Sequence, residues 1–152
     1  MEARMTNPAY VLPDAQKGIQ TVLKAIQSGG TDGTVLELVH LRASQINGCS
    51  ACIYAGVANA RKGGESEDRL ATVVAWRESP FFTDAERAAL ALTEAVTRVA
   101  DRSDDAVSDT LWDEVADHFD EKQLSSIILM IGITNLFNRI NATVREPAGK
   151  TW

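Results

Sequence analysis

The sequence contains few residues of several types, and each scarcity excludes a class of protein. Only two cysteines and two histidines occur among 152 residues, whereas a structural zinc site needs about four ligands. We therefore expect no metal and no other bound cofactor. Basic residues number 15 against 21 acidic ones, for a net charge of −6. Nucleic acids and anionic membranes favour basic surfaces, so we expect neither as a partner.

Long apolar runs are also missing. No stretch approaches the roughly 20 apolar residues that cross a bilayer. The first ten residues, MEARMTNPAY, lack the apolar segment of a signal peptide. These features predict a cytoplasmic protein. The hydrophobic content of 45% and charged content of 24% are ordinary for a soluble globular chain, and the length suits a single domain.

Strand-like alternation of polar and apolar residues is not evident, and the chain has instead the pattern of helices separated by glycine, proline and capping residues. The spacing TDAE at 83–86 and DEKQ at 120–123 predicts two capping boxes. The expected fold class is all-α, with about seven helices at 14–28, 33–46, 49–62, 66–78, 83–100, 109–118 and 120–144.

The predicted helices form one domain over residues 10–145, between a flexible N-terminus (1–9) and a C-terminal tail (146–152). The last helix is apolar nearly all round over IILMIGITNLF, residues 127–137. Such a helix is buried on every side. In a chain of this size a subunit interface is a natural place for the additional apolar face, so we expect a homo-oligomer.

Both cysteines lie in the stretch QINGCSACIYAG, residues 45–56. Asn47-Gly48 predicts a turn, after which a helix begins close to Cys49. Cys49 and Cys52 are three positions apart, so their side chains are neighbours on that helix. The helix dipole favours a thiolate at Cys49. Such a dithiol can attack a peroxide or disulfide and then close a disulfide itself; the alternative is two inert buried thiols.

A dithiol of this kind needs a base, and the preceding helix contains one. Glu37 shares a face with His40, Leu41 and Ser44. If that face is partly buried, the carboxylate has a raised pKa suited to proton transfer. The alternative for Glu37 is a solvated surface acid, and His40 fits a surface or an interface equally well.

Several motifs together resemble the AhpD-like (alkylhydroperoxidase D core) branch of the carboxymuconolactone decarboxylase family. They are ELVHLRASQINGCSAC, ARKGGESEDRLATVVAWRESPFFTDAERAALALTEAVT, LWDEVADHF and IGITNLFNRIN, spread over residues 35–145. The resemblance implies an all-α fold that assembles into trimers or hexamers. It also implies a peroxidase in which a Cys-x-x-Cys dithiol reduces a hydroperoxide and is re-reduced by a lipoyl- or thioredoxin-like donor.

The resemblance assigns catalytic roles to Cys49, Cys52 and Glu37, since the glutamate of the family stands twelve positions before the first cysteine. The sequence departs from the family at Gly56, where peroxidases of this type have a histidine, and at Ala51, where some have a second one. Loss of a positioned base costs roughly 10²–10⁴ in rate, so a weakened peroxidase is expected.

Gly56 leaves a space that a water, a side chain of a neighbouring subunit or closer helix packing would fill. The order of attack is open: the helix N-terminus favours Cys49, whereas the resemblance favours Cys52. Two other functions are compatible with the sequence. One is a non-enzymatic redox sensor or binding module. The other is a decarboxylase-like small-molecule enzyme of the kind found in family members without the cysteines.

Overall fold

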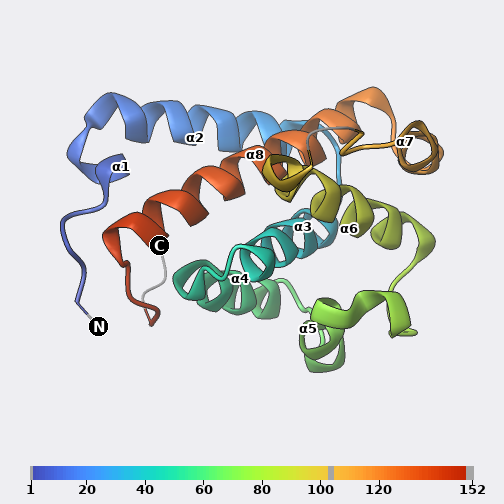
Figure 1. Ribbon diagram of the computed structural model, residues 1–152, viewed down its shortest axis with the longest axis horizontal. Coiled ribbons are helices and arrows are strands. Elements are labelled where there is room, and N and C mark those ends of the chain that lie inside the picture. Colours follow the sequence, from blue (N-terminus) through green and yellow to red (C-terminus); the bar gives the residue numbers. More distant parts are fainter. Residues whose placement is uncertain (1, 103–104, 150–152) are drawn as a thin grey trace.

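The structure is a computed structural model that describes residues 2–102 and 105–149. This part of the chain forms eight α-helices and two 3₁₀-helices and has no strand, which confirms the all-α prediction (Figure 1). The helices are α1 (Pro8–Val11), α2 (Pro13–Ser28), α3 (Gly33–Ile46), α4 (Ser50–Lys62), α5 (Glu67–Thr72), η1 (Val73–Glu78), α6 (Asp84–Thr97), η2 (Val99–Asp101), α7 (Asp109–Ala116) and α8 (Glu121–Val144).

Helices α3 and α8 form the centre of the fold. They pack against each other, α2 covers α8, and α4 and α6 pack on α3 (Figure 1). The larger core cluster includes Leu36 and Val39 of α3 with Ile127 and Ile131 of α8, all at most 1% exposed. A smaller cluster joins α3 to α4, η1 and α6. Because α3 is covered from several sides, its polar side chains also lie inside the molecule.

The predicted capping boxes at the starts of α6 and α8 are both confirmed. At α6, Thr83 Oγ1 accepts from the Glu86 amide at 3.3 Å and Glu86 Oε2 accepts from the Thr83 amide at 2.8 Å. At α8, Asp120 and Gln123 make the same exchange at 2.9 and 3.0 Å. These side chains satisfy amides that the first helical turn leaves unpaired, which explains why the local spacing located both helix starts.

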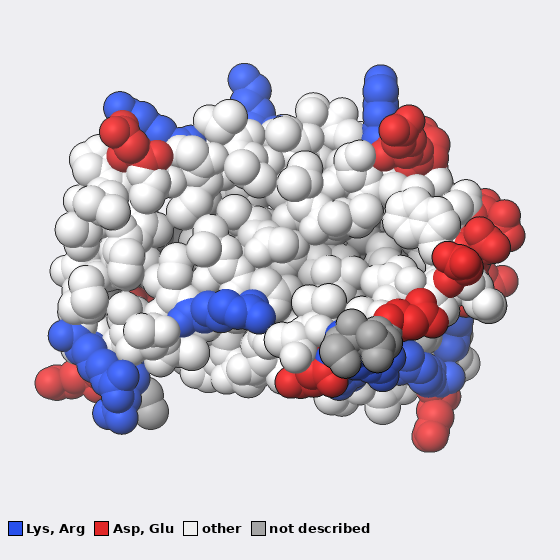
Figure 2. Space-filling view, turned by 45° about the horizontal axis from the view of Figure 1, so that its top comes forward, with Lys and Arg blue, Asp and Glu red and all other residues white. Residues whose placement is uncertain are grey.

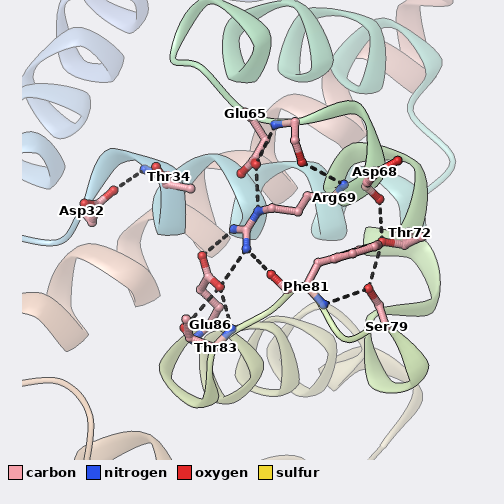
Figure 3. Close-up of polar contacts among 11 residues, drawn as sticks. Asp32, Thr34, Glu65, Asp68, Arg69, Thr72, Ser79, Phe81, Thr83 and Glu86 are labelled. Carbon is pink, nitrogen blue, oxygen red and sulfur yellow. Dashed lines mark hydrogen bonds and ion pairs between the residues drawn. The ribbon is translucent and has the colours of Figure 1, made fainter.

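The helix predicted over 66–78 is interrupted: α5 is followed directly by the 3₁₀-helix η1, which contains a kink at Ala75 (φ −122°, ψ 36°). After the kink, Trp76 is buried and its Nε1 donates to Glu94 at 3.0 Å. Val74 is 56% exposed. Arg69 then ties α5 to α6, since its guanidinium pairs with both Glu65 and Glu86 (Figure 3). A tertiary hydrogen bond and ion pairs therefore override the helical periodicity here.

The N-terminal segment is held to the end of α8. Asn7 caps α1 by accepting from the Ala9 amide at 3.0 Å, and both residues are about 5% exposed. The Arg4 amide donates to the Val144 carbonyl at 2.8 Å, which brings the two ends of the chain to the same side of the molecule (Figure 1). The boundary predicted between residues 9 and 10 therefore falls inside a packed helix. The predicted tail extends past residue 149 into the part that the structure does not describe.

Helix α8 is long and apolar enough to cross a bilayer by length and composition alone, which corrects the expectation that no stretch is; 44% of its most apolar window is buried within the fold. Its other side presents Ile128, Leu129 and Leu136 to solvent, each at least 39% exposed. The face of the molecule toward α2 carries charged side chains mainly around its edge (Figure 2). The single chain thus leaves apolar surface uncovered.

Candidate functional site

The turn between α3 and α4 places both cysteines. Asn47 caps α3, and Gly48 follows with φ +66°, a conformation that glycine adopts without a Cβ penalty. Cys49 is the N-cap of α4, one position before the first helical turn in which the sequence placed it, and its Sγ accepts from the Cys52 amide at 3.3 Å. The amides at the start of α4 therefore point toward the sulfur of Cys49.

Cys49 and Cys52 are joined by a disulfide, with Cα atoms 5.3 Å apart. Their exposed fractions are 5% and 2%. The prediction that the two thiols are close enough to bridge is confirmed. The pair lies between the start of α4 and the C-terminal half of α8, away from the two main core clusters.

Three asparagines of α8 surround this turn. Asn135, Asn138 and Asn141 are spaced i, i+3, i+6, so they share one helix face. Asn47 Nδ2 donates to Asn135 Oδ1 at 3.0 Å and to Asn138 Oδ1 at 2.8 Å. The sequence reasoning missed this stripe because it treated α8 as an apolar helix; the repeated spacing in NLFNRIN was the available signal.

Asn141 contacts the sulfurs directly. Its Nδ2 lies 3.3 Å from Cys52 Sγ and 3.9 Å from Cys49 Sγ, and its Oδ1 accepts from Asn7 Nδ2 at 2.9 Å. Both asparagines are at most 5% exposed. The dithiol thus has a buried amide beside it that comes from the far end of the chain.

Glu37 and His40 lie one turn apart on α3 and face the same interior. Glu37 Oε2 is buried and has no hydrogen-bond partner among the described residues. Burial therefore raises the pKa of Glu37 above its ordinary value. Burial lowers the pKa of His40, although its hydrogen bond to the Cys52 carbonyl opposes that effect. Both groups favour their neutral forms more than they would in water.

His40 fills the space beside Gly56. A Cβ built on Gly56 would lie 2.8 Å from His40 Cδ2 and 3.2 Å from Nε2. The imidazole is held there by a 3.3 Å contact between Nε2 and the Cys52 carbonyl and a 3.4 Å contact between Nδ1 and Thr134 Oγ1. Of the three alternatives given for the space at Gly56, closer helix packing is the one that the structure shows, since α3 packs on α4 with His40 of the same chain against Gly56.

Cys52, Glu37 and His40 line one cavity of about 440 Å³. Among the residues that the structure describes, no lysine or arginine lines it and Glu37 is its only carboxylate, whereas Cys49 is not one of its lining residues. Its walls come chiefly from apolar side chains of α2 and α8, and exposed residues border it toward solvent. The apolar members are Ala9, Ile19, Leu23, Met130, Ile133 and Phe137, and the exposed ones are Tyr10, Gln16, Gln20, Gln27 and Asn59.

The structure therefore brings together all the residues singled out from the sequence: the two cysteines, Glu37, His40 and Gly56. It adds Asn141, for which the spacing in NLFNRIN was the only sequence signal, and Asn7 and Thr134, which no local pattern marked. Chemically, the site combines a reversible dithiol, two proton-exchanging groups and an uncharged apolar cavity.

The fold and the sequence are shared with known proteins. The sequence profile of the carboxymuconolactone decarboxylase family matches residues 13–95. An uncharacterized protein of Bacillus subtilis, YdfG, is 35% identical over 138 residues, which cover 91% of this chain and 92% of YdfG. The chain belongs to the carboxymuconolactone decarboxylase family.

Similar solved structures identify the branch of the family. A crystal structure from Agrobacterium tumefaciens, of a protein of unknown function considered a candidate AhpD antioxidant defence protein, superposes with a TM-score of 0.88 at 33% identity and covers 98% of this chain and 99% of its own. The chain is thus of the AhpD-like branch. The debrominase Bmp8 in its apo form superposes with a TM-score of 0.77 at 23% identity, covering 90% of this chain and 72% of Bmp8, and shares the fold.

Proposed function

We propose that the protein is a thiol-based oxidoreductase that reduces organic hydroperoxides with the Cys49–Cys52 pair. The observation that carries the proposal is the position of Cys52, which lines the same cavity as a carboxylate without a hydrogen-bond partner among the described residues and a half-buried histidine. The cavity walls are apolar and lack cationic side chains. They suit an uncharged alkyl or aryl hydroperoxide better than a substrate that carries a carboxylate.

In the proposed reaction, Cys52 is the attacking residue. Its thiolate attacks the terminal oxygen of the hydroperoxide, the O–O bond breaks, and the alkoxide takes up a proton to leave as an alcohol. Cys52 is then a sulfenic acid. The thiol of Cys49, which does not line the cavity, attacks the sulfur of Cys52 and releases water, which closes the disulfide.

Glu37 and His40 supply the proton transfer. The thiol proton of Cys52 passes to this pair and returns to the departing alkoxide, so the base ends each cycle unchanged. The raised pKa of the Glu37 carboxyl and the lowered pKa of the His40 imidazole lie closer together than the ordinary values of the two groups, which suits proton exchange between them. His40 therefore substitutes for the histidine that relatives have at the position of Gly56, reaching the same space from α3.

The cycle needs a partner that returns two electrons to the disulfide. A dithiol donor of the lipoyl or thioredoxin type would do so by thiol–disulfide exchange. We further propose a homo-oligomer, such as a trimer or hexamer, that covers the exposed apolar side of α8, and a cytoplasmic location. Sedimentation would test the assembly, because a stable species of 16.5 kDa would contradict it.

The activity is tested by adding cumene hydroperoxide to the reduced protein and counting free thiols. We expect two thiols lost for each hydroperoxide consumed, and continued turnover when dihydrolipoamide is supplied. Cys52→Ser should consume none. Cys49→Ser should consume one equivalent and stop at a sulfenic acid that a dimedone-type reagent traps.

The same assay separates the alternatives. A redox sensor would lose its thiols once and show no turnover with any dithiol donor. A decarboxylase-like enzyme would retain its activity in the Cys49→Ser/Cys52→Ser double variant. Either outcome would replace the proposed peroxidase.

A further inference from the structure

The hydrogen-bond chain beside the disulfide fixes the orientation of the Asn141 amide. Side-chain amides have two orientations that are hard to distinguish by shape, and the network decides between them. The Ala9 amide can only donate, so the atom of Asn7 facing it is Oδ1. Asn7 Nδ2 then faces Asn141, which must present Oδ1 in return. The remaining group of Asn141, its NH₂, points at Cys52 Sγ.

We propose that Asn141 is a catalytic residue that stabilises the thiolate of Cys52, and that Asn7 is the positioning residue that orients it. A disulfide sulfur is a weak acceptor, whereas a thiolate is a charged one, so the same N–H bond is stronger in the reduced protein. The amide thus favours the reduced, ionised form of Cys52 over both the thiol and the disulfide. This inference rests on the proposed dithiol chemistry and adds Asn141 to the residues that carry it out.

Burial increases the effect of the Asn141 amide on the Cys52 thiolate. Asn141 and Asn7 are 3% and 5% exposed, and Cys52 is 2% exposed, so little water is available to replace the amide. In such surroundings a thiolate without a donor is strongly disfavoured. Both asparagines lie outside residues 13–95, the part that the family profile matches. Their contribution therefore comes from segments near the two ends of the chain.

The first measurement is the pH dependence of Cys52 alkylation by iodoacetamide in a Cys49→Ser background. Asn141→Leu should raise the apparent thiol pKa by about one unit, the shift expected for loss of a hydrogen bond to a charged group. Asn141→Asp keeps the shape but places a carboxylate beside the sulfur, so it should raise the pKa at least as much. Asn7→Ser retains a cap for α1 but loses the NH₂ that orients Asn141, and should give a smaller rise.

The second measurement is the equilibrium of the full dithiol with a dithiothreitol buffer. Loss of the amide should make the disulfide harder to reduce by about tenfold, equivalent to roughly 30 mV. Neither readout uses a hydroperoxide, so both are independent of whether the protein turns one over. Circular dichroism and thermal melting show whether each variant is folded. If Asn141→Leu does not fold, both measurements are made on Asn141→Asp instead.

The matched control is Asn138→Leu, which removes an equally buried asparagine one turn earlier on α8 that bonds Asn47 and Ser44 rather than sulfur. Asn138→Leu should lower the free energy of unfolding and leave the pKa of the Cys52 thiol unchanged. The proposal is overturned if Asn141→Leu and Asn141→Asp titrate like the parent, or if Asn138→Leu shifts the pKa equally. Asn7→Ser titrating like the parent would remove the positioning role of Asn7.

Discussion

Two buried glutamates, on opposite sides of α3, are treated differently by the fold. Glu94 of α6 accepts from Arg42, Arg77 and the Trp76 indole at 2.7 to 3.0 Å. Burial alone would raise its pKa, but these donors outweigh burial and lower the pKa to about 2. Glu37 has one buried oxygen with no partner among the described residues, and burial raises its pKa.

The difference separates a carboxylate held by cations from one to which we assign proton transfer in the proposed reaction. A buried acid surrounded by cations is permanently charged and holds helices together, as Glu94 does between α3, η1 and α6. An acid that faces a cavity without a cation exchanges protons readily, because its two forms lie closer in free energy near neutral pH. On the side of α3 that faces the disulfide, the carboxylate of Glu37 thus has no cationic partner, whereas on the opposite side the carboxylate of Glu94 is paired with arginines.

The largest effect is expected for Glu37→Gln. It should lower hydroperoxide turnover by roughly 10²–10⁴, the contribution of a positioned base. Because the folded state penalises the ionised carboxylate, the same change should raise the free energy of unfolding at pH 7 by about 0.5–2 kcal/mol. Urea denaturation and a peroxidase assay measure the two effects. A Glu37→Gln protein with normal turnover would place the base elsewhere.

The isosteric change Glu94→Gln, on the opposite side of α3, should lower stability and leave turnover unchanged. Removing one partner of a buried ionic network leaves arginines without their counter-charge, and we expect a loss of about 3 kcal/mol in the free energy of unfolding. The residual turnover of the folded fraction should be unchanged. The exposed pair Arg61–Glu67 is the control: Glu67→Gln should leave the urea midpoint where it is.

Moving the histidine back to position 56 sharpens the comparison further. His40→Ala should lower turnover by about 10², and His118→Gln, at the exposed second histidine, should not. Gly56→His alone meets the His40 ring, so it should displace that ring rather than add a base. The double variant His40→Ala/Gly56→His has room for the new imidazole and should recover about tenfold of the loss. No recovery, together with no rescue by added imidazole, would argue against His40 as a relay.

The smallest expected effect is an acid-dependent one. The folded pKa of Glu94, about 2, lies below its ordinary value of 4.5. Its contribution to stability is therefore complete above pH 4.5 and is lost as the pH falls toward 2. The stability difference between wild type and Glu94→Gln should shrink over that window and be constant from pH 5 to 7. A difference that stays constant down to pH 2.5 would contradict the assignment.

The sequence predicted those features that depend on local chemistry. Helix starts at Thr83 and Asp120 were found because a capping box needs only neighbouring residues. The bridge between Cys49 and Cys52 followed from helical spacing. Glu37 was found because the glutamate of the family that the sequence resembles stands twelve positions before the first cysteine.

The remaining features depend on contacts between distant helices. His40 fills the space at Gly56 only because α3 and α4 approach closely, and this distance is not encoded in either helix alone. Asn141 meets the sulfurs through the packing of α8, and Asn7 through a segment that the composition indicated to be flexible. The break at Ala75 follows from the indole of Trp76 finding Glu94. None of these has a local signature, because each is decided by tertiary packing.

The contact between Asn7 and Asn141 spans 134 positions of the chain, which has a consequence for biosynthesis. A growing chain is made from its N-terminus, so α1 and both cysteines exist well before α8. Until α8 docks, the thiols lack their amide donor and are open to cellular oxidants. We therefore expect the surroundings of Cys49 and Cys52 to be complete only after α8 has been made and has packed against the turn that holds them.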